Sequence, residues 1–155
     1  MSKVLSLYQK LTRYPAGHWL FSRAVCLQAP YFGSIHPRFD LLESGRAEAH
    51  IRRRRSVQNH IGTIHAIALC NLAELVAGVG IEATLTTDRR WIPKGMQVQY
   101  LAKCKHSAHA KARIEIPVDI GTGANCIIPV EIFDRDGTKV ARADINMWVT
   151  PTRAA

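Results

Sequence analysis

The chain has 155 residues, a length typical of one globular domain with a buried core. Apolar residues make up 47% of the sequence and charged residues 21%, which excludes an intrinsically disordered chain. The formal net charge of +9 favours an anionic partner: nucleic acid, an acidic membrane surface or a phosphorylated small molecule. Aromatic residues are only 7% and no nucleic-acid-binding module is evident, so we expect no nucleic-acid partner.

Cysteine usage and the absence of targeting features favour a cytoplasmic protein. The four cysteines lie far apart without a CxxC pair, which predicts free thiols in a reducing compartment. They are Cys26, Cys70, Cys104 and Cys126. Charged residues interrupt the N-terminal segment, so it lacks the apolar core of a signal peptide. We expect no transmembrane segment and no membrane partner.

The first 57 residues predict two helices and two strands. Apolar residues follow a helical spacing over 2–14, and Pro15 and Gly17 end that helix before a second one at about 18–28. A strand over 35–42, a turn and a second strand over 46–57 follow, the last with alternating apolar and polar residues.

The stretch 59–80 is the one around which we expect the chain to fold. Residues 66–79 are almost entirely apolar, and a helix that is apolar on every side is buried. At about 14 residues this helix is too short to cross a bilayer, which needs about 20. Glu74 lies within it, and burying a carboxylate is costly unless it is hydrogen-bonded or used. Asn59, Gly62 and Thr63 predict a tight loop before the helix, with Thr63 as the N-cap.

The spacing of two polar residues predicts a dimer. His65 and Glu74 are nine residues apart, which at about 100° per residue places them on opposite sides of the helix. One chain therefore does not bring both to the same small molecule. Two helices side by side do, if the start of one faces the middle of the other.

Strands dominate the remainder of the sequence. We expect them at 81–92, 96–106, 110–118, 126–134 and 138–150, with turns at 93–95 and 121–125 and a hairpin at Asp136-Gly137. One apolar helix lying on one antiparallel sheet is an α+β arrangement.

The sequence Asn59-x-x-Gly62-Thr63-x-His65-Ala66, followed by Leu72-Ala73-Glu74, resembles a known signature. Hotdog-fold thioesterases of the phenylacetate-pathway and 4-hydroxybenzoyl-CoA types carry Asn-x-x-Gly-x-x-His-Gly-Gly and then Leu-Ala-Asp or Leu-Ala-Glu. The resemblance spans about residues 35–150. It implies a hotdog domain at 31–155, with one long buried helix packed on a curved antiparallel sheet, behind an N-terminal helical extension at 1–30.

The resemblance also implies an activity and a set of site residues. The activity is hydrolysis of an acyl-CoA or acyl-carrier-protein thioester at the interface of a homodimer or tetramer. Glu74 from the opposite subunit would be base or nucleophile, the Ala66 N–H would polarise the carbonyl, and Asn59 and His65 would act as positioning groups. The implied substrate-binding residues are Gly62, Ala66, Ile67, Thr86, Arg89 and Arg90. Coenzyme A enters as part of the substrate, without a metal or other cofactor.

Departures from the family pattern leave alternatives open. Ala66-Ile67 replaces the Gly-Gly pair, and the Ile67 side chain is expected to narrow or block the acyl entrance. A non-catalytic acyl-CoA-binding protein is the first alternative. An acyl dehydratase that pairs His60 with Glu74 is the second.

Two further groups of residues have both a functional and a structural interpretation. Arg52–Arg55 either binds coenzyme A phosphates or forms a solvated charged strand. Arg89, Arg90 and Lys94 form a second candidate group for the same phosphates. His106 and His109 are spaced like metal ligands, but no cysteine or carboxylate cluster accompanies them in sequence, which favours solvent-exposed side chains.

Overall fold

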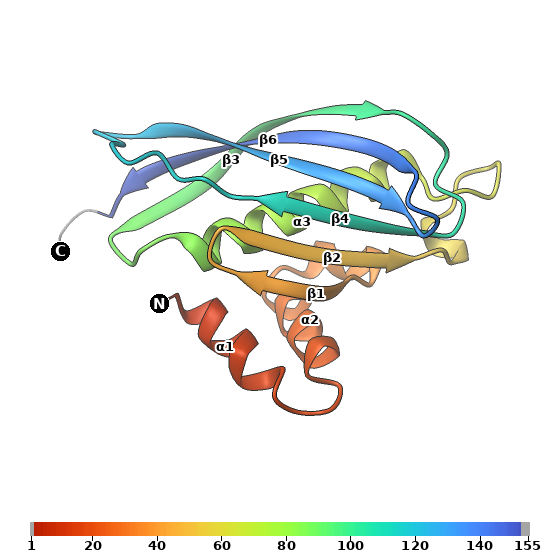
Figure 1. Ribbon diagram of the computed structural model, residues 1–155, viewed down its shortest axis with the longest axis horizontal. Helices are drawn as coiled ribbons and strands as arrows, with labels where there is room; N and C mark the ends of the chain where they lie inside the picture. The colour runs from red at the N-terminus through yellow and green to blue at the C-terminus, as the bar shows by residue number, and fades with distance from the viewer. Residues whose placement is uncertain (1, 153–155) are drawn as a thin grey trace.

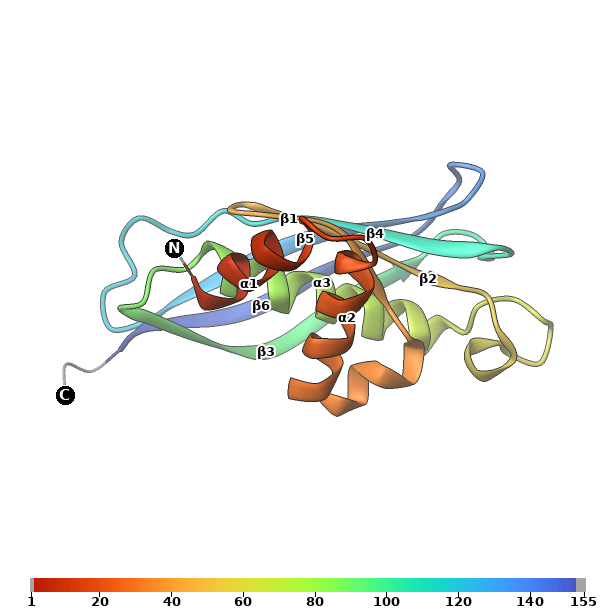
Figure 2. The ribbon, with the colours of Figure 1, turned by 90° about the horizontal axis from the view of Figure 1, so that it is seen from below.

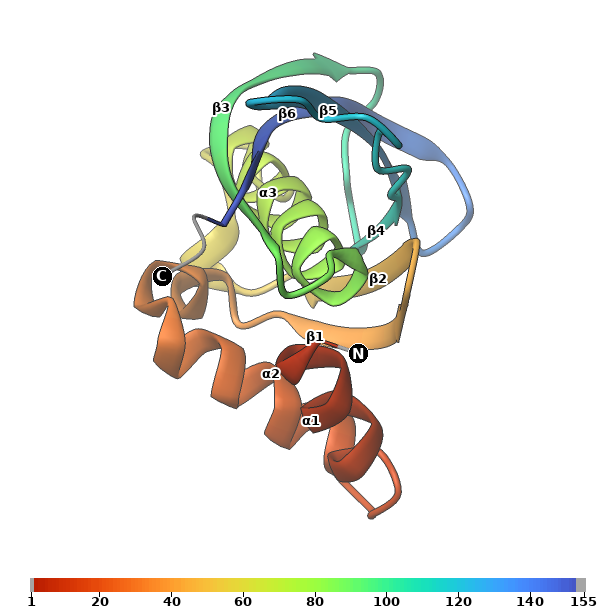
Figure 3. The same cartoon turned by 90° about the vertical axis from the view of Figure 1, so that its left-hand side faces the viewer.

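A six-stranded antiparallel sheet curves around one long helix (Figures 1 and 3). The computed structural model describes residues 2–152. The strand order across the sheet is β1-β2-β4-β5-β6-β3, and every neighbouring pair is antiparallel. The strands are β1 (Arg38–Glu43), β2 (Arg46–Arg52), β3 (Arg89–Tyr100), β4 (Ser107–Arg113), β5 (Ala124–Asp134) and β6 (Lys139–Pro151).

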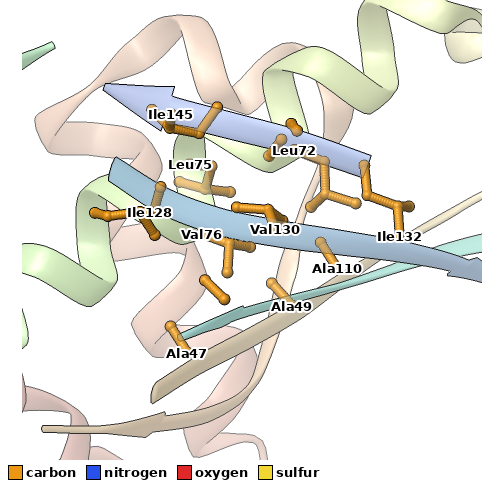
Figure 4. Close-up of a cluster of buried hydrophobic side chains, with 14 of the residues drawn as sticks. Ala47, Ala49, Leu72, Leu75, Val76, Ala110, Ile128, Val130, Ile132 and Ile145 are labelled. Carbon is orange, nitrogen blue, oxygen red and sulfur yellow. The ribbon is translucent and has the colours of Figure 1, made fainter. Parts of the chain in front are cut away.

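Helix α3 (Ala66–Thr84) fills the hollow of the sheet and forms the centre of the core (Figure 4). Leu72, Leu75 and Val76 are fully buried, and the bulky apolar residues of β5 and β6 cover the helix. On the β2 and β4 side the sheet presents alanines, including Ala47, so the helix approaches closely. Gly80 lies at this contact, where an added Cβ would stand 3.1 Å from the Ala47 Cβ. The prediction of a buried central helix is confirmed.

The length predicted for this helix was wrong. The helix has 19 residues, because residues 80–84 continue it beyond the predicted end. By length and composition alone it is therefore able to cross a membrane, but most of its apolar surface is buried inside the sheet. Its apolar character is explained by its position in the core.

The two predicted N-terminal helices are α1 (Lys3–Leu11) and α2 (Gly17–Gln28), and they pack beside β1 and α3 (Figure 2). Phe21 lies between Tyr8 and Phe39 in edge-to-face contacts, with 5.0 and 5.4 Å between the ring centroids. These rings fasten the helical extension to the sheet. A short 3₁₀ helix, η1 (Pro30–Ile35), which the sequence did not predict, leads into β1.

Other boundaries also differ from the sequence predictions. Residues 81–84 are helical rather than the start of a strand. Pro93–Gly95 is not a turn but lies within β3, at an irregularity in its register with β6. Proline is tolerated there because β3 is an edge strand. Arg52–Arg55 does not alternate as a strand, since β2 ends at Arg52 and the 3₁₀ helix η2 (Arg55–Val57) follows.

The C-terminal hairpin matches its prediction. Strands β5 and β6 pair along most of their length, and Gly137 in the connecting turn has φ +86°. A positive φ at this position favours glycine. All four cysteines are free thiols, as expected.

Candidate active site

The loop before α3 is held together by Asn59. Its Oδ1 accepts hydrogen bonds from the N–H groups of Ile61 and Thr63, each at 3.1 Å, and its Nδ2 donates to Thr63 Oγ1 at 2.9 Å. Gly62 adopts φ +79° in the turn. The predicted tight loop is confirmed, and the Asn59 side chain is engaged by the loop itself. His60 lies exposed at the loop tip.

The first turn of α3 has an unused hydrogen-bond donor. The N-cap is His65, not Thr63 as predicted: His65 Nδ1 accepts from the Ile67 N–H at 3.1 Å. The N–H groups of Ala68 and Leu69 donate to the His65 carbonyl. Within residues 2–152 the Ala66 N–H has no acceptor. Because N–H groups at a helix start carry a partial positive charge, this one is suited to bind a developing anion.

Ala66 lines a hollow of about 320 Å³, which we call the helix-start pocket. The loop at Asn59 forms one wall and the chain from Tyr100 to Cys104 forms the other. The Tyr100 hydroxyl lies 2.9 Å from Cys70 Sγ, and this hydrogen bond, with burial, raises the pKa of Tyr100 to about 12. The Tyr100 hydroxyl stays protonated at neutral pH. No sequence motif singled it out, because strand pairing alone brings it beside α3.

Ile67 does not line the helix-start pocket. Its side chain is 57% exposed and lies in a separate hollow beside Tyr31, His65 and Asn71. Within the single chain Ile67 therefore does not narrow the pocket beside Ala66, and its effect on an acyl entrance formed by two chains stays a prediction. Consecutive residues on a helix point about 100° apart, which explains why Ala66 and Ile67 face different hollows.

Glu74 faces a third hollow, of about 440 Å³, between the N-terminal helices, α3 and β3. The lining is mostly apolar and includes Phe21, Phe32 and Trp91, so we call it the apolar hollow. Glu74 is half-buried there and makes no hydrogen bond or ion pair with any residue in 2–152. Glu82 shares the hollow but accepts a 2.7 Å hydrogen bond from Trp91 Nε1. Glu74 is therefore the carboxylate that stays available.

One chain does not bring Ala66 and Glu74 together. They are eight residues apart on α3, or about 12 Å along the helix axis, and they line different hollows. A thioester bound by one of them is out of reach of the other within the same chain.

The remaining predicted substrate-binding residues lie at the opposite end of α3. Thr86 is exposed in the turn before β3. Arg89 donates to the carbonyls of Pro117 and Val118 at 3.2 and 3.3 Å, and Arg90 Nε donates to Thr150 Oγ1 at 3.3 Å. The single chain thus does not bring them to the loop at Asn59.

Carboxylates do accompany His106 and His109, contrary to the sequence interpretation. His106 Nδ1 lies 3.3 Å from Asp134 Oδ2, while His109 lies beside His50 and Asp40. The His50 and His109 rings stack with 5.1 Å between centroids and 23° between planes. Their in-plane lone pairs therefore lie in two nearly parallel planes, an arrangement that does not favour a shared metal ion.

Comparison with known proteins identifies the family. The family described as "Domain of unknown function (DUF4442)" matches residues 17–149. The chain belongs to this family. No curated protein matches the sequence.

Solved structures identify the fold. A crystal structure from a genomics programme is 41% identical, covers 97% of both chains and has a TM-score of 0.82. A Pseudomonas aeruginosa protein, described as a probable thioesterase, is 20% identical over 90% of this chain and 97% of that one, with a TM-score of 0.78. A thioesterase family protein from Silicibacter pomeroyi is 16% identical over 84% of this chain and 96% of that one, with a TM-score of 0.72. The hotdog fold expected from the sequence is confirmed.

Proposed function

We propose that this protein is a thioesterase that hydrolyses an acyl-CoA or acyl-carrier-protein thioester at a composite site of a homodimer in the cytoplasm. The observation that carries the proposal is the pair of unused groups on α3. The Ala66 N–H lies in the helix-start pocket and the Glu74 carboxylate in the apolar hollow. Thioester hydrolysis requires both a donor for the developing oxyanion, which the Ala66 N–H supplies, and a base, which Glu74 supplies. Within one chain these two groups lie apart.

The edge of the sheet supports a dimer that would join these halves. Strand β3 pairs with β6 on one side, and within residues 2–152 no strand pairs with its other side. Ile92, Met96 and Tyr100 are large side chains exposed on it. A second copy paired antiparallel along β3 would cover this edge and form one continuous sheet.

That pairing would also align the two helices. Tyr100, at the end of β3, lies beside the first turns of α3. Trp91, near the beginning of β3, lies beside Glu82 in the last turns of α3. A two-fold axis near Tyr100, which contacts Cys70 midway between Ala66 and Glu74 on α3, would place the two α3 helices side by side and antiparallel. The start of one helix would then face the middle of the other, with Ala66 of one chain opposite Glu74 of the other chain.

In this arrangement the Ala66 N–H donates to the thioester carbonyl oxygen as negative charge develops on it. Glu74 of the other chain takes a proton from water, and the hydroxide adds to the carbonyl carbon. The tetrahedral intermediate expels the thiolate, which takes up the proton, and releases the carboxylic acid. Asn59 and His65 act as positioning residues, because their side chains hold the loop and the helix start.

The test is free-thiol release from short, medium, long and aromatic acyl-CoAs by the wild type, Glu74→Ala and Glu82→Ala. Glu82 is the matched control, since its carboxylate shares the apolar hollow but is bound by Trp91. We expect turnover to collapse in Glu74→Ala and to persist in Glu82→Ala. Equal turnover in all three proteins would refute the role of Glu74. Binding of acyl-CoA without turnover would favour a non-catalytic acyl-CoA-binding protein.

A further inference from the structure

The face of the sheet turned away from α3 carries a concave cluster of basic residues. Alternation along β2 and β4 places their alanines against the helix and their polar side chains on this outer face. Strand pairing sets His50 opposite His109 and Arg52 opposite Ser107. The hollow has a volume of about 540 Å³, and we call it the basic basin. It is lined by His50, Arg52, Arg53, His106, Ser107, His109 and Arg135.

The arginine charges of the basin are not neutralised by any carboxylate of the described residues. Among residues 2–152, no ion pair involves Arg52, Arg53 or Arg135. The two nearby carboxylates contact basin histidines rather than the arginines, Asp40 at His50 and Asp134 at His106. Asp40 lies 2.7 Å from His50 Nδ1, and Asp134 binds backbone N–H groups below the basin.

Asp134 fixes the walls of the basin. Its side chain accepts from the N–H groups of Lys105 (2.7 Å), His106 (3.1 Å), Ser107 (3.1 Å) and Arg135 (2.7 Å). Burial alone would raise its pKa, but these four donors outweigh it and bring the pKa to about 2. The carboxylate therefore stays ionised and joins the start of β4 to the β5–β6 turn. The backbone that carries Ser107 and Arg135 is held in place.

We propose that the basic basin binds the phosphate groups of a nucleotide, with Arg52 and Arg135 as the main ligands. Arginine suits this task because its planar guanidinium forms paired hydrogen bonds with phosphate oxygens. Ser107 Oγ, 2.9 Å from His109 Nε2, adds a hydroxyl to the same wall. A hollow of about 540 Å³ has the size of a small-molecule site rather than that of a single phosphate ion.

The position of the basin favours the nucleotide part of a coenzyme A thioester over a free nucleotide. Arg53 Nη1 donates to the Gly62 carbonyl at 3.3 Å, so the basin adjoins the loop whose other side lines the helix-start pocket. Phosphates in the basin would leave the pantetheine arm free to pass this loop toward Ala66. This assignment of the ligand rests on the proposed thioesterase function, whereas phosphate binding itself does not.

Calorimetric binding tests the site without any need for turnover. The probes are coenzyme A, adenosine 3′,5′-bisphosphate, ADP and inorganic phosphate, against the wild type and Arg52→Gln/Arg135→Gln. Arg142→Gln is the matched control, because Arg142 is exposed on β6 away from the basin. We expect the double variant to bind coenzyme A at least tenfold more weakly, with the control unchanged and inorganic phosphate weak. ADP bound as tightly as coenzyme A would identify a free nucleotide as the ligand. Equal affinities in the wild type and the double variant would overturn the proposal.

A kinetic experiment separates failure of the basin from failure of the thioesterase proposal. An acyl-pantetheine lacks the nucleotide, so the double variant should hydrolyse it as the wild type does. For the acyl-CoA with the same acyl group, the KM of the double variant should rise about tenfold while its kcat stays unchanged. If the double variant hydrolyses acyl-CoA with an unchanged KM, the proposal that the basic basin binds the nucleotide is contradicted, whereas the thioesterase proposal is not. If the double variant binds coenzyme A more weakly but the wild type hydrolyses no thioester, the thioesterase proposal is contradicted, whereas phosphate binding in the basic basin is not.

Discussion

Replacing Ala66 by proline removes the hydrogen-bond donor on which the proposed chemistry depends and little else. Ala66 is the first residue of α3, a position where the fixed φ of proline suits a helix. His65 has ψ 140°, the extended conformation that a residue before proline adopts. Since the Ala66 N–H has no acceptor in the described chain, no protein hydrogen bond is lost. Stability should therefore change by less than about 1 kcal/mol.

The effect on turnover should be far larger. Loss of one oxyanion donor lowers kcat by about 10²–10³-fold, equivalent to about 2.7–4 kcal/mol of transition-state stabilisation. The assay is thiol release at saturating acyl-CoA, with thermal unfolding measured on the same samples. Ala66→Ser, which retains the N–H, is the control and should stay active. A proline variant that melts like the wild type and turns over at the wild-type rate would refute the role of this N–H.

Three further predictions concern stability. In Gly17→Ala the new Cβ would lie 2.0 Å from the Leu11 carbonyl oxygen, so thermal unfolding should show a loss of about 1–3 kcal/mol, whereas Gly33→Ala has only an ordinary 3.8 Å contact and should be neutral. His65→Ala removes the N-cap and should cost about 1 kcal/mol in urea unfolding, which His65→Asn should largely restore. Since the pKa of Asp134 is about 2 instead of 3.8, its ionised form contributes about 2 kcal/mol that is present above pH 4 and lost as the pH falls toward 2. Asp134→Asn should lose about that much at pH 7 and show a flatter stability profile between pH 4 and 2; an equally steep profile would contradict this reasoning.

The sequence predicted the central helix because an unbroken apolar run leaves few alternatives to burial. It misplaced the helix end because Ile81 and Thr84 are β-branched and favour strands locally. In the structure, burial of Ile81 and the close contact at Gly80 keep the helix going to Thr84. Tertiary packing thus outweighs a weak local preference.

The site was predictable only where its residues are close in sequence. The motif from Asn59 to Glu74 occupies one loop and one helix, so its spacing alone was enough to propose a composite site. Tyr100 and the His50–His109 pair are brought into place by strand pairing, which the sequence does not encode as a local pattern. Asp40 reaches His50 at a register irregularity in β1, a feature with no local signature.

Subunit complementation tests the composite site most directly. Ala66→Pro and Glu74→Ala homodimers should each be inactive, since both of their sites lack one essential group. When the two variants are co-expressed in equal amounts, half of the dimers contain one Ala66→Pro chain and one Glu74→Ala chain. One of the two sites in such a mixed dimer has both groups intact. Activity should therefore recover to about a quarter of the wild-type value for equal amounts of protein. If the mixture stays as inactive as its components while mixed dimers are demonstrably present, the two groups do not act across the subunit interface.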